Sequence, residues 1–248
     1  MEFRIFEHSV VDSTSERAFQ ALSASVARHA DLHVAREQLA GRGRRGARWF
    51  SAADQGLYAS LVLRTARLLE PAAVTMGAGL AVLATLCEQG LARAELKWPN
   101  DLQVGGAKLC GILAETRGLD PTSPHCVVGI GINVGQREFP PELTGVRAVT
   151  SLALCGIDTD PRAVLALLLP HLSREMERVE RDPAATVTAY FSATGLANRR
   201  VRVQSGDSEI EGSWRELGLS KGVGVELADG TLRHVRLEHV RALIEIAG

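Results

Sequence analysis

The sequence has few cysteines and almost no net charge, and each shortage excludes a class of protein. Four cysteines occur in 248 residues, widely spaced and never as a CxxC pair. They indicate free thiols in a reducing cytoplasm rather than metal ligands or disulfides. Lysine and arginine number 28 against 29 aspartates and glutamates, so no global positive field attracts nucleic acid or an anionic membrane. Any site for anions must therefore be local.

Long apolar segments are also scarce. The N-terminal segment lacks the basic stretch followed by an apolar stretch that marks a signal peptide. The longest apolar run, residues 72–87, is short for a membrane span and contains threonine and glycine. We therefore expect a cytoplasmic protein with no membrane partner.

The first 197 residues carry the pattern of a mixed α+β domain with a largely antiparallel sheet. Asp12-Ser13-Thr14-Ser15 offers N-cap side chains to a first helix, and Pro71 begins a long helix through Glu88 in which Gly77 and Gly79 permit close packing on a sheet. Gly105-Gly106 reads as a hairpin turn. The expected strands cover residues 32–39, 57–63, 95–98, 108–116 and 126–134.

The rest of the chain divides into helices and then short strands. Pro161 begins an amphipathic helix that Pro170 should kink or split, and Pro183 begins another through Phe191. After Asn198 short alternating segments are separated by glycine turns, which is typical of a small β barrel. We therefore predict two domains, residues 1–197 and 198–248.

The stretch GRGRRGARWF, residues 41–50, joins two of the expected strands and has no apolar face. Its glycines let backbone N–H groups approach an anion, and its guanidinium groups bind oxyanions bidentately. It is not a Walker A loop, and no helix follows it as a Rossmann loop requires. Taken alone, it fits a solvated basic hairpin tip about equally well. The residues concerned are Gly41, Gly43 and Gly46 with Arg42, Arg44, Arg45 and Arg48.

Three further stretches combine polar or glycine residues with buried strands. In the stretch KWPND, residues 97–101, a strand ends at Lys-Trp because the proline stops its pairing, and Asn100 and Asp101 follow in a turn. Ordinary turn chemistry also explains Asn-Asp at this place. KLCGILAE begins with Lys108 and is interrupted by Gly111, and a glycine in mid-strand often marks the close approach of a ligand. VVGIGINVG, residues 127–135, is equally compatible with a tightly packed central strand.

Taken in order, these motifs closely resemble the biotin protein ligase family over most of residues 10–135. The series is DSTS, QLAGRGRRGARWFS, LYASLVLR, KWPNDLQVGGAKLCGILAE and VVGIGINVG. The resemblance implies a class II synthetase-like catalytic domain, with a small SH3-like β barrel at the C-terminus. It also implies that biotin and Mg·ATP give biotinyl-5′-AMP, from which biotin passes to a lysine of the biotin carboxyl carrier protein of acetyl-CoA carboxylase or a related carboxylase.

The resemblance assigns roles to individual residues. It implies catalytic roles for Arg42, Arg44, Lys108 and Asp101, with Mg²⁺ bound near Asp101 or through the ATP phosphates. It implies biotin binding by Ser13, Thr14, Ser15, Gln38, Arg42, Gly43, Arg44, Lys108 and Gly111. It implies adenylate binding by Gly41, Trp49, Asn100, Gly129, Gly131 and Asn133, with Trp49 packed over the ligand.

The sequence departs from the family motifs at two places, and it leaves alternative functions open. The family's DSTN reads DSTS, so Ser15 replaces an amide, and no aromatic residue for adenine stands between Arg147 and Leu152. A lipoate or octanoate ligase and a noncatalytic biotin-binding module are the alternative functions. A DNA-binding repressor needs a winged helix-turn-helix ahead of DSTS, where only about ten residues stand, so no nucleic-acid partner is expected. We expect a monomer or weak homodimer.

Overall fold

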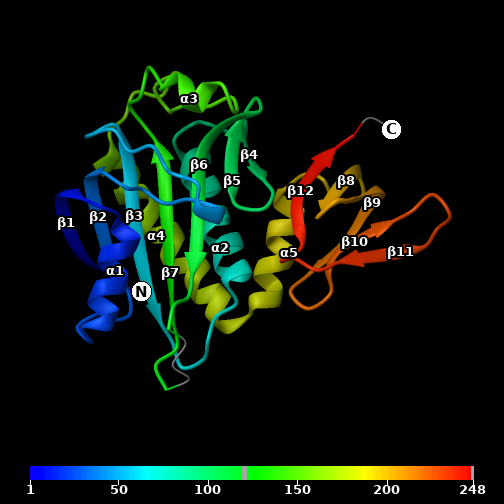
Figure 1. Cartoon of the computed structure of the whole chain (residues 1–248), viewed down its shortest axis with the longest axis horizontal. Helices are drawn as coiled ribbons and strands as arrows, with labels where there is room; N and C mark the ends of the chain where they lie inside the picture. Colours follow the sequence, from blue (N-terminus) through cyan, green and yellow to red (C-terminus); the bar gives the residue numbers. More distant parts are fainter. Residues whose placement is uncertain (119–121, 247–248) are drawn as a thin grey trace.

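The computed structural model describes residues 1–118 and 122–246, which form two sheets with five α-helices and one 3-10 turn (Figure 1). The larger sheet has the strand order β1-β2-β3-β7-β6-β5-β4. In it β1 and β2 are parallel, and the other neighbours are antiparallel. The predicted α+β class with a largely antiparallel sheet is confirmed. The strands are β1 (Arg4–Val11), β2 (Asp31–Gln38), β3 (Gly56–Arg64), β4 (Ala94–Lys97), β5 (Asp101–Val104), β6 (Ala107–Glu115) and β7 (His125–Asn133).

Two of these strands differ from the sequence prediction. β1 was not expected, and it forms a parallel edge strand beside β2. β5 was read as part of a turn, but Asp101 is its first residue and pairs with Lys97 of β4 and Gly111 of β6. The placement of Asp101 in a turn is therefore wrong, and its carboxylate is fixed by a strand.

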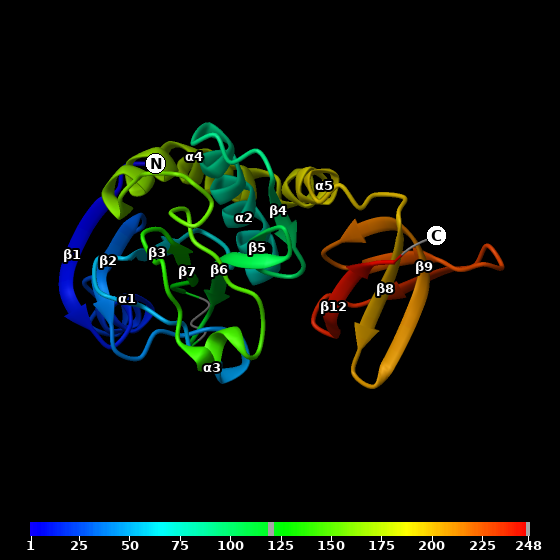
Figure 2. The same cartoon turned by 90° about the horizontal axis from the view of Figure 1, so that it is seen from above.

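Helices cover both faces of the large sheet (Figure 2). α1 (Thr14–Ser23) lies on one face, where Ala18 and Phe19 pack on Val62 and Val127. α2 (Pro71–Glu88), α4 (Pro161–Arg181) and α5 (Pro183–Ala193) lie on the other, and α3 (Pro141–Thr144) is a single turn. Along β7 the side chains of Val128, Ile130 and Ile132 face the main core, whereas Gly129 and Gly131 face the α1 side. Glycines thus clear space on the α1 face.

Helix α2 is the most apolar helix of the chain. Among the described helices it alone is long and apolar enough to cross a membrane, but 56% of it is buried inside the protein. Gly79 packs on the sheet as expected, with Leu96 Cδ2 3.2 Å from the position of an added Cβ, whereas Gly77 instead admits Val179 of α4 at 2.7 Å. Its composition is therefore that of a core helix between a sheet and a second helical layer.

Two expectations about helices need correction: the helix that begins at Pro161 is not split at Pro170, and Ser13 does not cap the first helix with its side chain. α4 runs through Pro170 as one helix, and it is stabilised by its contacts with α2 and by Asp160, whose carboxylate accepts from the backbone N–H groups of Arg162 and Ala163. Ser13 is the N-cap of α1, but its side chain makes no capping bond. Ser13, Thr14 and Ser15 instead line the hollow described below.

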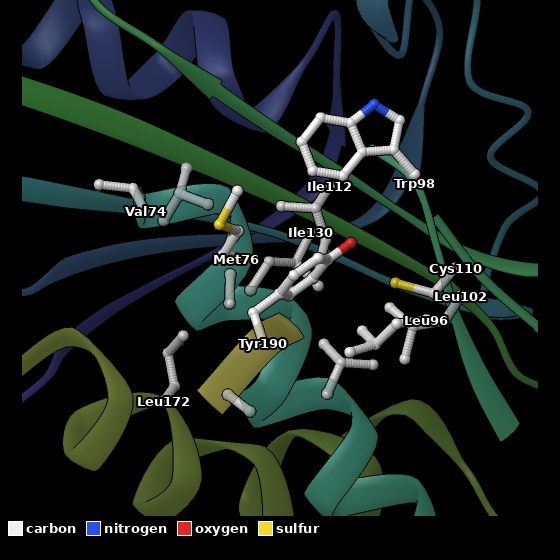
Figure 3. Packing of buried hydrophobic residues seen from close by; sticks show 14 of the residues in the cluster. Val74, Met76, Leu96, Trp98, Leu102, Cys110, Ile112, Ile130, Leu172 and Tyr190 are labelled. Atoms are coloured by element: carbon white, nitrogen blue, oxygen red, sulfur yellow. The ribbon is translucent and has the colours of Figure 1, made fainter. Parts of the chain in front are cut away.

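The C-terminal strands form a five-stranded antiparallel sheet of order β11-β10-β9-β8-β12. Its core joins that of the first sheet through an aromatic junction, which we define as Trp98, Tyr190, Phe191 and Trp214. Figure 3 shows the rings of Trp98 and Tyr190 among aliphatic core side chains. The strands are β8 (Arg200–Ser205), β9 (Ser208–Gly218), β10 (Gly222–Glu226), β11 (Leu232–Val235) and β12 (Val240–Glu245).

Candidate active site

The predicted site residues come together in one pocket on the α1 face of the large sheet, beside the N-terminus of α1. The loop between β2 and β3, residues 39–55, passes in front of β7 and β6 (Figure 1). Of the residues assigned from the resemblance, all but Gly41 and Asn133 line this pocket. They are Ser13, Thr14, Ser15, Gln38, Arg42, Gly43, Arg44, Trp49, Asn100, Asp101, Lys108, Gly111, Gly129 and Gly131.

One end of the pocket is a network of hydroxyl and amide groups. The Ser60 hydroxyl, fully buried on β3, lies 2.8 Å from Thr14 Oγ1 and 2.9 Å from Ser15 Oγ. Gln38 Oε1 accepts from the Thr14 backbone N–H at 2.8 Å, and its Nε2 donates to Ser51 Oγ at 2.9 Å. The hydroxyl of Ser15 is therefore held by another hydroxyl where the family has an amide. The sequence prediction missed Ser60, because it stands inside the apolar strand LYASLVL.

The floor of the pocket consists of glycine backbone under the indole of Trp49. A Cβ added to Gly131 would lie 2.5 Å from Trp49 Cε2, and one added to Gly111 would lie 2.7 Å from Cζ3 of the same ring. Neither glycine has a positive φ, so both are required by space and not by backbone conformation. Trp49 therefore packs directly on β6 and β7.

Gly131→Ala tests this contact. The added methyl group must displace Trp49, and overpacking of this kind costs about 1–3 kcal/mol. We expect the midpoint of thermal unfolding to fall by about 2–12 °C, given 2–4 °C per kcal/mol for a chain of this size. Gly218→Ala is the matched control, because its Cβ would meet nothing closer than Lys221 Cβ at 3.7 Å. Equal midpoints for both variants would show that Trp49 is not packed as described.

The opposite end of the pocket holds cations around one carboxylate. Lys108 Nζ donates to Asp101 Oδ1 at 2.5 Å, and Arg147 Nη1 lies 3.4 Å from Asp101 Oδ2. The Lys108 side chain is 12% exposed, and burial lowers the pKa of its ammonium group, although Asp101 opposes the shift. The same ammonium lies 5.3 Å from the centre of the Trp49 ring. An incoming anion would thus meet a pre-positioned cation in a partly dry site.

Of the four loop arginines, Arg42 and Arg44 point to opposite rims of the pocket. Arg44 Nη1 lies 3.5 Å from Asn100 Oδ1, and burial, followed by repulsion from Arg45, lowers the pKa of its guanidinium group. Asn100 is itself fixed, because its Nδ2 donates to the Ile112 carbonyl at 2.7 Å. Arg42 points the other way and pairs with Glu115 at 3.0 Å. Arg44 is thus the loop cation that contacts a neutral amide.

The two predicted residues outside the pocket have identifiable places. An added Cβ on Gly41 would lie 2.6 Å from the Trp49 carbonyl, so this glycine permits the loop to close on itself. Asn133 donates to the Thr150 carbonyl at 2.9 Å and lines an adjacent small hollow on the other side of Trp49. The hollow is lined by aromatic and aliphatic side chains together with three cations: Phe50, Phe139, Leu143, Val149, Arg48, Lys108 and Arg147.

The residues at Asp101 do not fit a resident metal ion. Two cations already face its carboxylate, at 2.5 Å and 3.4 Å. Within residues 1–118 and 122–246 no three side chains of His, Cys, Asp or Glu come together as a metal site. The expectation of Mg²⁺ at Asp101 is therefore not supported by its surroundings. A magnesium ion would reach this pocket as part of a Mg·nucleotide.

Comparison with known proteins gives a consistent set of relatives. Residues 8–133 match the model of the biotin/lipoate A/B protein ligase family. The bifunctional ligase/repressor BirA of Escherichia coli is 31% identical over 218 residues, which cover 86% of this chain and 64% of that protein. The biotin--[acetyl-CoA-carboxylase] ligase of Paracoccus denitrificans is 33% identical and covers 72% of this chain and 77% of its own length.

The solved structures agree with the sequence relatives. The biotin protein ligase of Aquifex aeolicus, in complex with biotin and ATP, superposes with a TM-score of 0.80 at 27% identity, covering 98% of this chain and 99% of that one. The chain spans between 50% and 66% of the length of the ligase/repressor relatives it matches.

Proposed function

Because the chain belongs to the biotin/lipoate A/B protein ligase family, we propose that it activates biotin with ATP to biotinyl-5′-AMP. The biotin then passes to a lysine of a biotin carboxyl carrier protein, that of acetyl-CoA carboxylase or a related carboxylase. The observation that carries the proposal is one pocket with a hydroxyl and amide end, a glycine floor and a cationic end. These three parts suit the ureido ring, the chain and the carboxylate of biotin in that order.

The roles of individual residues follow from their places in the pocket. Ser13, Thr14, Ser15 and Gln38 bind the ureido ring, which has both donors and an acceptor. Gly111 offers backbone to the ligand. The adenine of the nucleotide lies in the adjacent hollow near Phe50 and Phe139, where aromatic rings are available although none stands between Arg147 and Leu152.

The first step joins two anions. A carboxylate oxygen of biotin attacks the α-phosphorus of ATP, and the bond from that phosphorus to the leaving pyrophosphate breaks. Lys108 and Arg44 offset the repulsion between the reactants and stabilise the charge that develops on the phosphoryl oxygens. Mg²⁺ enters as part of the Mg·ATP substrate. No covalent bond to the enzyme is required.

The second step brings a carrier lysine to the mixed anhydride. Its amine, neutral once the ammonium proton has passed to water, attacks the biotinyl carbonyl; the bond from the carbonyl carbon to the phosphate oxygen breaks, AMP leaves with that oxygen, and the extra proton on the new amide nitrogen passes to water. A second groove shares Arg44 and Asn100 with the pocket and extends to Leu237 and Glu238, in the segment between β11 and β12. We assign the acceptor lysine to this groove, because its apolar walls suit the methylene chain and Glu70 and Glu238 suit the ammonium head before that head loses its proton. Asp101 then orients the amine.

Pyrophosphate release tests the proposal. With Mg·ATP we expect release to depend on biotin and not on lipoate or octanoate, and a carrier domain to gain one biotin. Release with lipoate or octanoate would favour the alternative ligase. Tight binding of biotin without any release would favour a noncatalytic biotin-binding module.

Other parts of the proposal concern organisation. We propose residues 1–197 as the catalytic domain and 198–248 as the small C-terminal domain, of which residues 247–248 lie outside the described structure. A cytoplasmic location, a monomer or weak homodimer and no binding to nucleic acid remain predictions. Sedimentation and gel-shift measurements test the last two.

A further inference from the structure

The arginine loop is attached at both rims of the pocket, but by different means. Inside the loop, backbone N–H groups of Gly43 and Trp49 donate to the carbonyls of Ala47 and Gly41 at 2.7 and 2.9 Å. These two bonds hold the loop together but do not fix it to the sheet. The loop is fixed to the rest of the protein at its ends, by backbone bonds from Leu39 and Ala40 and by the packing of Trp49 on the sheet, and between these ends by the side chains of Arg42 and Arg44.

On one rim, Arg42 belongs to a cluster of four charged side chains, two arginines and two glutamates. Its guanidinium lies 3.0 Å from Glu115, the last residue of β6, and 3.7 Å from Glu16 of α1. Arg117 pairs with the same two carboxylates, at 2.8 Å from Glu16 and 4.0 Å from Glu115. Two cations thus face two anions, and the charge of Arg42 is already matched.

Glu115 is better placed to hold Arg42 than an ordinary surface carboxylate is. Its side chain is 21% exposed, and its Oε2 is buried without a hydrogen-bond partner. Burial and the neighbouring charge of Glu16 raise the pKa of its carboxyl group. A carboxylate that is partly buried and lies near another carboxylate needs a neighbouring cation to stay ionised.

We propose that Glu115 is a positioning residue that anchors the Arg42 end of the loop to β6, so that Arg42 acts on the ligand through the closed loop. The identity of the ligand rests on the proposed function, whereas the anchoring of the loop rests on the ion pairs of Arg42 and Glu115. Strand β6 then carries three functions in order: Lys108 meets the ligand anion, Gly111 forms the floor, and Glu115 holds the loop shut. Arg44 is left free to bind the phosphate.

A double-mutant cycle separates an anchor from a ligand-binding cation. The variants are Glu115→Gln, Arg42→Gln and the two combined. If Arg42 works through Glu115, each single variant and the double variant share one effect, because both changes remove the same contact. We expect biotinyl-5′-AMP to leave about twofold to fivefold faster in all three, the size typical of one partly exposed ion pair. The rate of adenylate formation should change less than the rate of release.

Hydrogen exchange of residues 41–48 in the ligand-free protein gives a readout that does not depend on any activity. We expect faster exchange of this segment in the three variants, and unchanged exchange in Glu211→Gln, which removes a comparable Arg–Glu pair from the C-terminal sheet. If the parent protein makes no biotinyl-5′-AMP, the proposed function is wrong. The hydrogen-exchange measurement still tests whether Glu115 anchors the loop.

Two results would overturn the inference. One is unchanged exchange of residues 41–48 in Glu115→Gln. The other is additive effects on release, with Arg42→Gln far more severe than Glu115→Gln, which would mean that Arg42 binds the ligand itself.

Discussion

Lys108→Ala is expected to lose adenylate formation by about tenfold to a hundredfold or more while the protein stays folded. The ammonium group is the buried cation at the anionic end of the pocket, 2.5 Å from Asp101. Its removal takes away a charge-assisted contact, worth roughly 1.5–3 kcal/mol. It also leaves the Asp101 carboxylate with Arg147 at 3.4 Å, so the pocket repels the carboxylate of biotin. Biotin-dependent pyrophosphate release measures the loss.

The control for this variant is Lys221→Ala, whose side chain is 70% exposed in the turn between β9 and β10. Both variants should remain folded at the assay temperature, but Lys108→Ala should unfold at a lower temperature than Lys221→Ala, because it breaks a largely buried ion pair. Near-normal pyrophosphate release by Lys108→Ala would remove this lysine from the chemistry.

Arg44→Gly is expected to make the protein label the wrong lysines. A mixed anhydride reacts with water and with any accessible amine, so it must be held until the carrier arrives. Arg44 is half-buried, contacts a neutral amide and is free to bind the phosphate. Without it, retention of the adenylate should weaken by roughly 1.5–3 kcal/mol, or about tenfold to a hundredfold in dissociation rate. Synthesis should persist while selectivity is lost.

Biotin blots after incubation with serum albumin, biotin and Mg·ATP measure this effect. Arg45→Gly is the matched control, because Arg45 is exposed in the same loop and has a φ of 55°. Glycine there adds the same backbone freedom without removing a pocket cation. Selective labelling by Arg44→Gly, or equal loss of selectivity in both variants, would show that the Arg44 side chain does not retain the intermediate.

The sequence predicted those elements whose pattern is local. The buried strand β3, the helix α2 and the glycine turn at Gly105-Gly106 all carry strong periodicity or turn residues, and they stand where expected. β1 was missed because its side chains are mostly exposed and it has a single neighbour, so no apolar face marks it. β5 has four residues and owes its existence to pairing with β4 and β6. Neither pairing is visible in a short window of sequence.

The same distinction applies to the site. Motif residues such as Thr14, Arg44 and Lys108 were found because they stand in recognisable stretches. The partners that hold them were not: Ser60 lies within an apolar strand, and Glu115 faces Arg42 across 73 residues of chain. Contacts of this kind are set by the register of β6 and by the path of the loop. Only the folded arrangement could reveal them.

The aromatic junction limits how this protein can be recombined with its relatives. Trp214 of the C-terminal sheet is fully buried and meets the rings of Phe191 at 4.8 Å and Trp98 at 6.5 Å. A chimera spliced at residue 197 would join Trp98 and Phe191 of one parent to β9 of another. The packed rings would then come from two proteins whose side chains were not matched to each other. The smallest transplantable piece is therefore the C-terminal sheet together with α5 and a matched residue at position 98.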